Sequence, residues 1–427
     1  MSGAGRTKAA VTVALLGLLA VPGLQAGAAT PPTFTVATSL DAPDANPGDG
    51  ACLSTLPGGA CSLRAAIQEA STVSGSTVQL PAGNFRLSIA PQPTDEVAGS
   101  AEAVDGAHGD LVIDTAMTVL GAGADRTVID GAGLDRVFAI GHSGNAHLSD
   151  LTITGGDPSH RGTSQAIALG GAVLNTGAVQ LDRVALIGNR ADGGGGMFST
   201  PRTIPVVRNS LIAGNRAFSG GGLRLDSGGT IINSTITGNT LLPLPETVQA
   251  LRDRAFPTLF SLLVNEGTGW GGGIDHRGGS NVVITNSTIT NNRAIRGGGG
   301  LASGQNYAPV SDKIALGTMT LRNTIVADNS STAGTANCHV KDQLITSLGH
   351  NLATDDSCFL TAAGDLPRTD PLLSPLADNG GPTQTQELTS QSPAIGAATG
   401  CPDSDQRGLP RAHGGACDIG AYEHQER

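Results

Sequence analysis

Residues 231–239 read IINSTITGN, and residues 284–292 repeat this stretch almost letter for letter as ITNSTITNN. Related stretches occur at residues 148–156 (LSDLTITGG), 181–189 (LDRVALIGN), 207–215 (VRNSLIAGN) and 321–329 (LRNTIVADN). A motif that recurs at intervals of about 20 to 50 residues is typical of a stack of repeated units. The chain is therefore predicted to be a solenoid, in which each unit covers the open face of the next.

Each copy alternates apolar with small polar residues, which is the period of a strand that buries one face. The apolar positions align in one column, which consists of Ile153, Leu186, Ile212, Ile236, Ile289 and Val326. Parallel strands stacked in register require such equivalent residues at equivalent positions. The asparagines that end three successive copies lie 26 and then 24 residues apart. A coil of that length accommodates three short strands and three turns, so the predicted fold class is all-β: a right-handed parallel β-helix solenoid with an N-terminal capping helix and one helical insertion.

Two columns of asparagine accompany these strands. The first column consists of Asn209, Asn233, Asn286 and Asn323, and the second of Asn215, Asn239, Asn292 and Asn329. Asparagine tolerates the left-handed backbone that a tight corner needs, and its amide can bond to the asparagines above and below. We predict that these residues form structural amide ladders at the corners of the coils.

The segments around the repeats define the predicted domain organisation. Residues 33–109 are assigned to an N-terminal cap and the first coils, because residues 61–70 (CSLRAAIQEA) combine Ser62 as an N-cap with an apolar helical stripe. Residues 110–335 are assigned to the β-helix repeats. Residues 336–424 are predicted to be a C-terminal module that completes the helix.

Residues 240–269 break every rule of the repeat. Pro243 and Pro245 precede apolar residues at helical spacing, from Val248 to Leu263. This pattern predicts a helical insertion that projects from the stack. Two roles are open: the helix packs on the flank of the coils, or it forms a lid over a partner or substrate.

Residues 1–28 have the features of a secretory signal peptide. Arg6 and Lys8 precede an apolar run, and Ala26-Gly27-Ala28 suits a cleavage site. We expect a secreted bacterial protein, with the signal peptide removed, no membrane span, no C-terminal anchor and a monomeric state. The formal net charge of the whole chain is -11, which disfavours binding to nucleic acid.

The six cysteines form three local pairs along the chain. An even number of cysteines in an exported chain indicates disulfides, although six cysteines allow 15 pairings. We favour the sequential set, which joins Cys52 to Cys61, Cys338 to Cys358, and Cys401 to Cys417.

Both ends of the chain also resemble known modules. Residues 61–70, followed by residues 78–85, resemble the CSLREA-type motif that begins many bacterial exported β-helix proteins. The C-terminal part is similar to a choice-of-anchor Q-type module in the motifs DPLL (370–373), LADNGGPT (376–383), SPAI (392–395), DQRG (405–408) and CDIGAYE (417–423). The repeats resemble those of polymorphic outer-membrane-protein-like chains. Ala65 stands where the first motif has Glu, and Gly396 where the second module commonly has Asp. The resemblance implies an exported right-handed parallel β-helix protein and implies no particular activity.

One polar patch is the candidate for catalysis. Aligning residues 220–223 with residues 271–274 places Arg224 opposite Asp275, and Asp226 opposite Arg277. Two salt bridges between adjacent coils would explain these residues. The alternative is a catalytic set for a pectate-lyase-like polysaccharide lyase or a hydrolase, formed by Asp226, Asp275 and Arg277.

Two neighbours of this patch are weaker candidates for ligand binding. Trp270 precedes the second strand and offers an aromatic ring. His276 takes the register of Leu225, which favours a buried, hydrogen-bonded imidazole over a general base.

The loop before Cys52 contains Asp41, Asp44, Asn46 and Asp49. Oxygen ligands on a flexible loop suit calcium, but the spacing does not match the loop of an EF-hand. A solvated turn is the competing interpretation. No other cofactor is expected.

Aromatic residues amount to only 3% of the chain, although stacking aromatics are usual at carbohydrate sites. We therefore expect a secreted, non-catalytic β-helix protein with a surface, matrix or adhesion-type binding role. Its expected partner is an extracellular polysaccharide or another cell-surface component. The alternative is a polysaccharide lyase or hydrolase that acts on the β-helix face near the insertion.

Overall fold

The computed structural model describes residues 30–92, 106–158, 168–243, 268–303, 317–334, 336–340, 345–411 and 416–425. Two compact units are distinguished, Met1–Thr30 and Pro31–Arg427, and the fold below is that of the second unit. The predicted signal peptide and residues 244–267 of the predicted insertion lie outside the described residues. In the described ranges, no helix is long and apolar enough to cross a membrane.

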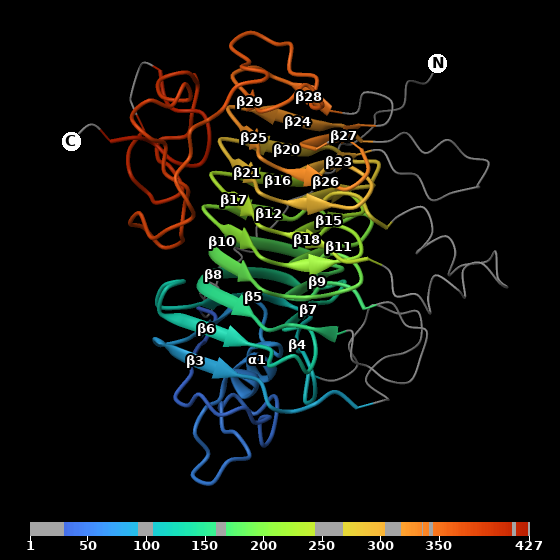
Figure 1. Ribbon diagram of the computed structural model, residues 1–427. Coiled ribbons are helices and arrows are strands. Elements are labelled where there is room, and N and C mark those ends of the chain that lie inside the picture. Colours follow the sequence, from blue (N-terminus) through green and yellow to red (C-terminus); the bar gives the residue numbers. More distant parts are fainter. Residues whose placement is uncertain are drawn as a thin grey trace, which may run out of the picture. The chain divides into compact units, whose positions relative to one another are not determined.

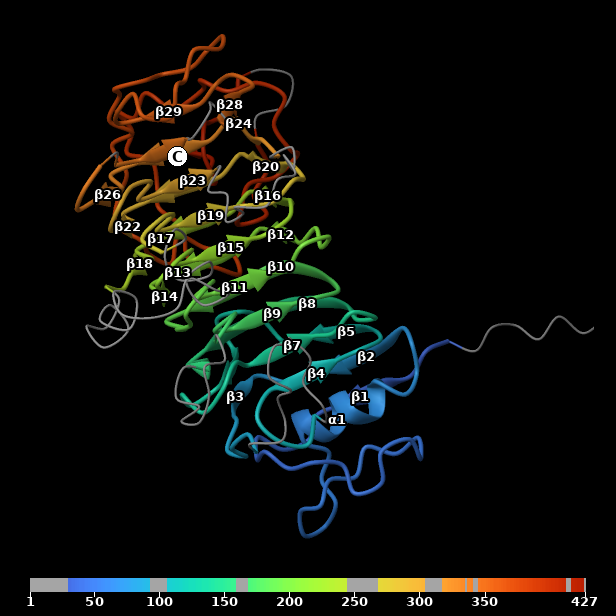
Figure 2. The ribbon, with the colours of Figure 1, turned by 90° about the vertical axis from the view of Figure 1, so that its right-hand side faces the viewer.

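The second unit is a right-handed parallel β-helix, which confirms the predicted fold class (Figure 1). Each full coil contributes one strand to each of three columns, and the columns run side by side along the stack (Figure 2). The first and second columns belong to one sheet of 17 strands, and the third column is a sheet of 8 strands. A small sheet of 4 strands lies at the corner between the second and third columns.

The first column consists of β1 (Thr33–Thr35), β2 (Ser76–Gln79), β5 (Ala116–Leu120), the long strands β8 (Asn145–Thr154) and β10 (Ala178–Ile187), β12 (Val206–Arg208), β16 (Gly229–Ile232), β20 (Val282–Thr285), β24 (Met319–Arg322) and β28 (Ile345–Ser347). The second column consists of β3 (Gly83–Arg86), β6 (Thr127–Asp130), the ends of β8 and β10, β13 (Leu211–Ala213), β17 (Thr235–Thr237), β21 (Thr288–Thr290), β25 (Ile325–Ala327) and β29 (Leu352–Ala353). The third column consists of β4 (Leu111–Ile113), β7 (Phe138–Ile140), β9 (Val173–Asn175), β11 (Met197–Ser199), β15 (Leu223–Leu225), β19 (Ile274–His276), β23 (Leu301–Ser303) and β27 (Cys338–Val340). The corner sheet consists of β14 (Arg216–Ala217), β18 (Thr240–Leu241), β22 (Arg293–Ala294) and β26 (Ser330–Ser331).

The apolar column predicted from the repeat is the core of the second column. Its residues pair in register from coil to coil, in the order Ile153, Leu186, Ile212, Ile236, Ile289 and Val326. All of them are buried, and they belong to a hydrophobic cluster that continues through the stack. The alternation of side chains along each strand explains this burial, because every second residue points into the coil.

The second asparagine column forms a continuous buried ladder. Each Nδ2 donates to the Oδ1 of the next asparagine at 2.9–3.1 Å, from Asn189 through Asn215, Asn239, Asn292 and Asn329 to Asn337. These residues do not occupy the left-handed region themselves. From Asn189 to Asn329, the residue before each asparagine supplies the positive φ instead, as at Gly214 and Gly238, with φ values of 64° and 65°. A coil corner at this position therefore combines a permissive residue with a buried amide.

The first asparagine column does adopt the left-handed backbone that the sequence predicts. Its four φ values lie between 47° and 51°. Its ladder is discontinuous, however, because Asn233 donates to Asn209 at 3.4 Å and Asn323 to Asn286 at 3.2 Å, whereas Asn286 donates to Cys401 Sγ at 3.1 Å. Some amides of the first asparagine column therefore bond to the C-terminal part of the chain instead of to the next asparagine.

The C-terminal segment, defined as residues 366–411 and 416–425, contains no strand of the stack. It folds back along the outer face of the second column, as the red part of Figure 1 shows. Thr235 Oγ1 donates to Gln406 Oε1 at 2.7 Å, and Ala421 N donates to Thr288 Oγ1 at 3.0 Å. Ile325 packs with apolar residues of the segment in a second hydrophobic cluster. The outer face of these coils is therefore covered rather than free.

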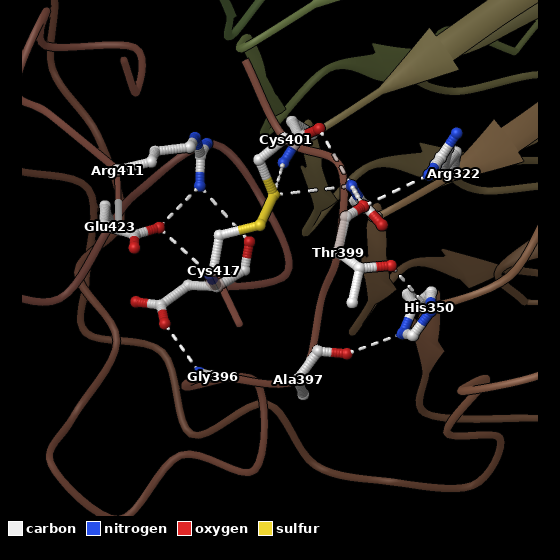
Figure 3. Close-up of a disulfide and its surroundings, with 12 residues drawn as sticks. Arg322, His350, Gly396, Ala397, Thr399, Cys401, Arg411, Cys417 and Glu423 are labelled. Carbon is white, nitrogen blue, oxygen red and sulfur yellow. Dashed lines mark hydrogen bonds and ion pairs between the residues drawn. A yellow bond between two sulfur atoms is a disulfide. The ribbon is translucent and has the colours of Figure 1, made fainter. Parts of the chain in front are cut away.

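Figure 3 shows how this segment is attached at the first corner. The disulfide between Cys401 and Cys417 lies between the Arg411–Glu423 ion pair, with an N–O distance of 2.9 Å, and the amides of the first asparagine column. Arg411 also donates to the backbone oxygen of Gly420 at 2.8 Å. The segment is thus held by a covalent bond within itself and by polar contacts to the coils.

The other two predicted disulfides are also present, between Cys52 and Cys61 and between Cys338 and Cys358. Disulfides of this local kind restrict the unfolded chain and so stabilise the loops that they close.

The N-terminal end of the stack is closed by α1 (Leu63–Ala70). Ser62 is its N-cap, with the side chain accepting a hydrogen bond from Ala65 N at 3.1 Å. The predicted apolar stripe of the helix is buried against β1, β2 and β4. The helix thereby covers the apolar end of the core, as a solenoid cap must.

The first two residues assigned to the predicted insertion belong to the stack. Thr240 and Leu241 form β18 and pair with β14 of the preceding coil, where Thr240 N donates to Asn215 O at 2.9 Å. The boundary at residue 240 was wrong because a two-residue strand carries almost no sequence pattern of its own.

Candidate functional site

The predicted catalytic patch lies on the third column. Arg224 of β15 pairs in register with Asp275 of β19, and Leu225 pairs with His276, as the alignment of the glycine clusters predicts. That alignment works because Gly220 and Gly271 occupy the same corner, with φ values of 59° and 65°. A Cβ at Gly271 would lie 2.4 Å from Ile274 O, so only glycine fits there.

The ion pairs differ from the prediction. Arg224 Nε donates to Asp226 Oδ1 at 2.9 Å, and Arg277 Nε donates to Asp275 Oδ2 at 2.6 Å. Both bridges therefore join residues two apart in the same coil, whereas the sequence predicted bridges between coils. Side chains two residues apart in an extended chain point to the same face, so each arginine can contact the aspartate of its own coil.

Three residues of this patch are buried, and Asp226 is partly exposed. Asp275 is 0% exposed, Arg224 5% and Arg277 8%. Burial raises the pKa of the Asp275 carboxyl despite the neighbouring Arg277, and burial together with Arg224 lowers the pKa of the Arg277 guanidinium. Within the described part of the chain, Asp275 Oδ1 has no hydrogen-bond partner. The patch thus has perturbed acids and bases, and most of its side-chain surface is buried.

The two weaker candidates next to the patch have structural partners. His276 is buried, with Nδ1 3.1 Å from Ser303 Oγ and Nε2 2.9 Å from Ser280 O. Burial lowers the pKa of this imidazole, so it is neutral at pH 7. The ring of Trp270 lies 4.0 Å from that of His339, measured between centroids.

The candidate calcium loop does not bring its four side chains together. Asp41 is paired with Arg64 at 2.8 Å, while Asp44 accepts from Asn46 N at 2.9 Å and Asp49 accepts from Ala51 N at 2.8 Å. In the described residues, no group of three or more His, Cys, Asp or Glu side chains is arranged to hold a metal ion. The aspartates instead connect the loop to itself and to α1, as in a hydrogen-bonded turn.

The C-terminal segment contains a pocket that the sequence did not predict. Its volume is about 590 Å³, and it is partly open to solvent. The lining residues are Asp378, Asn379, Glu387, Arg407, Tyr422, His424 and Gln425. Several of them belong to the quoted C-terminal motifs, which was the available signal, but only the folding of separate loops brings them together.

The pocket wall is built around Arg407 and Tyr422. The guanidinium carbon of Arg407 lies 3.7 Å from the centre of the Tyr422 ring, and its NH2 group lies 2.7 Å from Asp405 Oδ2. Tyr422 OH donates to Glu387 Oε1 at 3.0 Å, and burial raises the pKa of this hydroxyl. The arginine is thus neutralised by Asp405, while Asp378 and Glu387 offer carboxylate oxygens to a ligand.

Comparison with known proteins gives no family assignment. Neither a protein-family model nor a curated protein matches the chain. Among solved structures, the chain is similar to the pectate lyase Pel9A, with 15% identity, coverage of 93% of this chain and 97% of that one, and a TM-score of 0.43. It is also similar to the PL6 family alginate lyase AlyGC, with 11% identity, coverage of 81% and 55%, and a TM-score of 0.23. The fold assignment rests on the strand register, and the resemblances drawn from the terminal motifs stay predictions.

Proposed function

We propose that this protein is exported and binds polysaccharide outside the cell without cleaving it. The observation that carries the proposal is the open pocket of the C-terminal segment. Its carboxylates and carboxamide supply hydrogen-bond acceptors and donors beside an aromatic ring, which suits the hydroxyl groups of a sugar. Export is supported by the predicted signal peptide and by three disulfides, which persist in oxidising compartments.

The state of the predicted catalytic patch supports binding rather than cleavage. Asp226, Asp275 and Arg277 are engaged in ion pairs within their own coils, and two of the three are buried. Cleavage of a polymer requires acids and bases that reach the scissile bond. The pocket, by contrast, exposes Asp378 to solvent.

The test is a panel of neutral and acidic polysaccharides, measured by affinity electrophoresis and titration calorimetry. Glu387→Gln keeps the shape of the side chain and removes its charge, so the loss of a charge-assisted hydrogen bond should weaken binding about tenfold or more. Asp125→Asn is the matched control, because Asp125 is an exposed carboxylate on a coil turn. Binding that is equal in both variants and the wild type would exclude this pocket.

A polysaccharide lyase is the second candidate function. The observation in its favour is Asp275, whose buried Oδ1 lacks a hydrogen-bond partner in the described residues and lies beside an arginine of lowered pKa. The same panel, incubated with and without calcium, is assayed for unsaturated products that absorb in the ultraviolet. Products that disappear in Asp275→Asn would replace the non-catalytic proposal.

A further inference from the structure

A row of exposed arginines follows the second asparagine column. Arg216 of β14 pairs in register with Thr240 of β18, Thr240 with Arg293 of β22, and Arg293 with Ser330 of β26. Arg190 extends the row through a parallel bridge to Arg216. Figure 2 shows the four strands of this corner sheet stacked one above another at the left edge of the coils. We call these five residues the arginine row.

The side chains of the arginine row point outward. Arg190, Arg216 and Arg293 are exposed, whereas the next residues, such as Ala217 and Ala294, are buried. This alternation follows from the strand period, so the coil itself determines that the arginines face solvent.

The fold leaves two of these three charges, those of Arg216 and Arg293, without an ion pair among the described residues. Most other arginines of the stack and of the C-terminal segment sit against a carboxylate, as Arg64 does with Asp41 at 2.8 Å. Arg190 lies 3.8 Å from the carboxylate of Asp157, and its charge also acts on the carboxylate of Asp192. In the part of the chain that the structure describes, Arg216 and Arg293 form no ion pair. Their positive charges are therefore available to a partner.

The spacing of the row suits a linear polymer. Adjacent strands lie about 4.8 Å apart, so Arg190 and Arg216 are separated by one such step and Arg216 and Arg293 by about 9.6 Å. The hydroxyl of Thr240 occupies the position between them, and that of Ser330 the position after Arg293. The row thus presents two adjacent guanidinium groups, one hydroxyl and a third guanidinium group along a straight line of about 14 Å, with a second hydroxyl one step beyond.

We infer that the arginine row binds an acidic polysaccharide that lies parallel to the axis of the coils. This inference rests on the proposed function and names its ligand class. A planar guanidinium binds a carboxylate through two parallel hydrogen bonds, and the intervening hydroxyls can bond to sugar hydroxyls. The successive carboxylates of a polyuronate recur once per sugar unit, a length similar to one step of the stack.

Nucleic acid fits the row less well. Duplex DNA carries a charge about every 1.7 Å along its axis, far denser than three arginines over three steps of the stack. The row contains no aromatic side chain on which a base could stack, and the whole chain has a net charge of -11. Because the positive charges of the row are widely spaced, a ligand whose negative charges are also widely spaced fits the row better than duplex DNA.

The test compares polygalacturonate with its fully methyl-esterified form, which lacks the carboxylates. The variant Arg190→Gln/Arg216→Gln/Arg293→Gln removes the row. The matched control Arg86→Gln/Arg126→Gln/Arg368→Gln removes three exposed arginines elsewhere, with side chains 66%, 62% and 76% exposed. Both variants change the net charge equally, and equal thermal midpoints verify that both fold.

The row variant should bind polygalacturonate about tenfold more weakly than the wild type, with a shallower dependence on salt, because three screened ion pairs are lost. The affinity of the control variant should stay within about twofold of the wild type. Each of its three arginines already forms an exposed ion pair with an aspartate, so its charge contributes little to the attraction of a distant ligand. The inference is overturned if both variants lose affinity equally, if the ester binds as tightly as the acid, or if poly(dT) displaces polygalacturonate at equal concentration.

The failure of this inference differs from the failure of the proposed function. If the wild type and the row variant bind the ester or a neutral polysaccharide equally, and Glu387→Gln weakens that binding, the pocket proposal stands and the row proposal falls. If the wild type binds no polysaccharide of either kind, both fall.

Discussion

The two asparagine columns arise from the same repeat, yet they stabilise different parts of the molecule. Asn239 of the second column bonds only to its own stack, to Asn215, Asn292 and Ile212. Asn233 of the first column donates to Ser404 O at 2.8 Å and accepts from Arg411 at 3.4 Å, both in the C-terminal segment. One column connects coil to coil, and the other connects the coils to a segment that folds back on them.

This difference shows that a repeated residue need not have a repeated role. The second column is enclosed by the coils themselves, so each amide finds an identical partner above and below. The first column lies at the edge of the face that the C-terminal segment covers, and the partners of its amides depend on that segment. Substitutions in the two columns should therefore have different sizes and different consequences.

The largest effect is expected for Asn239→Leu. The substitution removes four buried hydrogen bonds, two of which Asn239 Oδ1 accepts from Asn215 and two of which its Nδ2 donates. Buried groups left without partners cost about 1–3 kcal/mol each, so the free energy of unfolding should fall by about 4 kcal/mol. Urea denaturation measures the change. Asn145→Leu on an exposed strand position is the control, and an equally small change in both variants would contradict the ladder role.

A smaller effect is expected for Asn233→Gly. Glycine tolerates the φ of 47° at this position, so the substitution tests the side chain rather than the backbone. One short and two long hydrogen bonds are lost, which should lower the free energy of unfolding by about 1 kcal/mol. Asn233→Leu should cost more, because leucine is strained at positive φ.

The location of the damage separates the two columns further. Limited proteolysis should cut the C-terminal segment faster in Asn233→Gly than in the wild type, while the coils stay protected. A loss of unfolding free energy as large as that of Asn239→Leu, with no change in the cleavage of residues 366–425, would show that the first asparagine column is also an internal ladder.

The remaining effect is a pH dependence within the stack, which is smallest near neutral pH. Amide ladders do not titrate, whereas the buried imidazole of His276 has a pKa lowered by burial. Below the unfolded pKa of about 6.5, the unfolded chain binds a proton that the folded chain does not, so stability should decrease as the pH falls from 7 toward 5. The slope is at most about 1.4 kcal/mol per pH unit for one proton.

The control for this dependence is His276→Gln, which retains a hydrogen-bonding side chain and cannot titrate. Its stability should vary less with pH than that of the wild type, as measured by urea midpoints at pH 5, 6 and 7. An identical pH profile in both proteins would assign the dependence to other groups.

The candidate site was much less predictable than the fold. The alignment of glycine clusters correctly placed Arg224 opposite Asp275, because backbone register repeats from coil to coil. The alignment did not determine which carboxylate forms an ion pair with each arginine, because that depends on side-chain conformations within a few ångströms. The pocket around Tyr422 was missed entirely, since its lining comes from loops without any periodic pattern.

By itself, the sequence determined the coils: the apolar column from Ile153 to Val326, the second asparagine ladder and the capping helix after Ser62. These contacts join equivalent positions of neighbouring coils or residues close along the chain, so a periodic sequence encodes them directly. Only the tertiary structure decided where the C-terminal segment lies, which joins residues such as Thr235 and Gln406, 171 positions apart. No repeat encodes that contact, because it depends on the shape and polarity of a face that exists only after the coils have stacked.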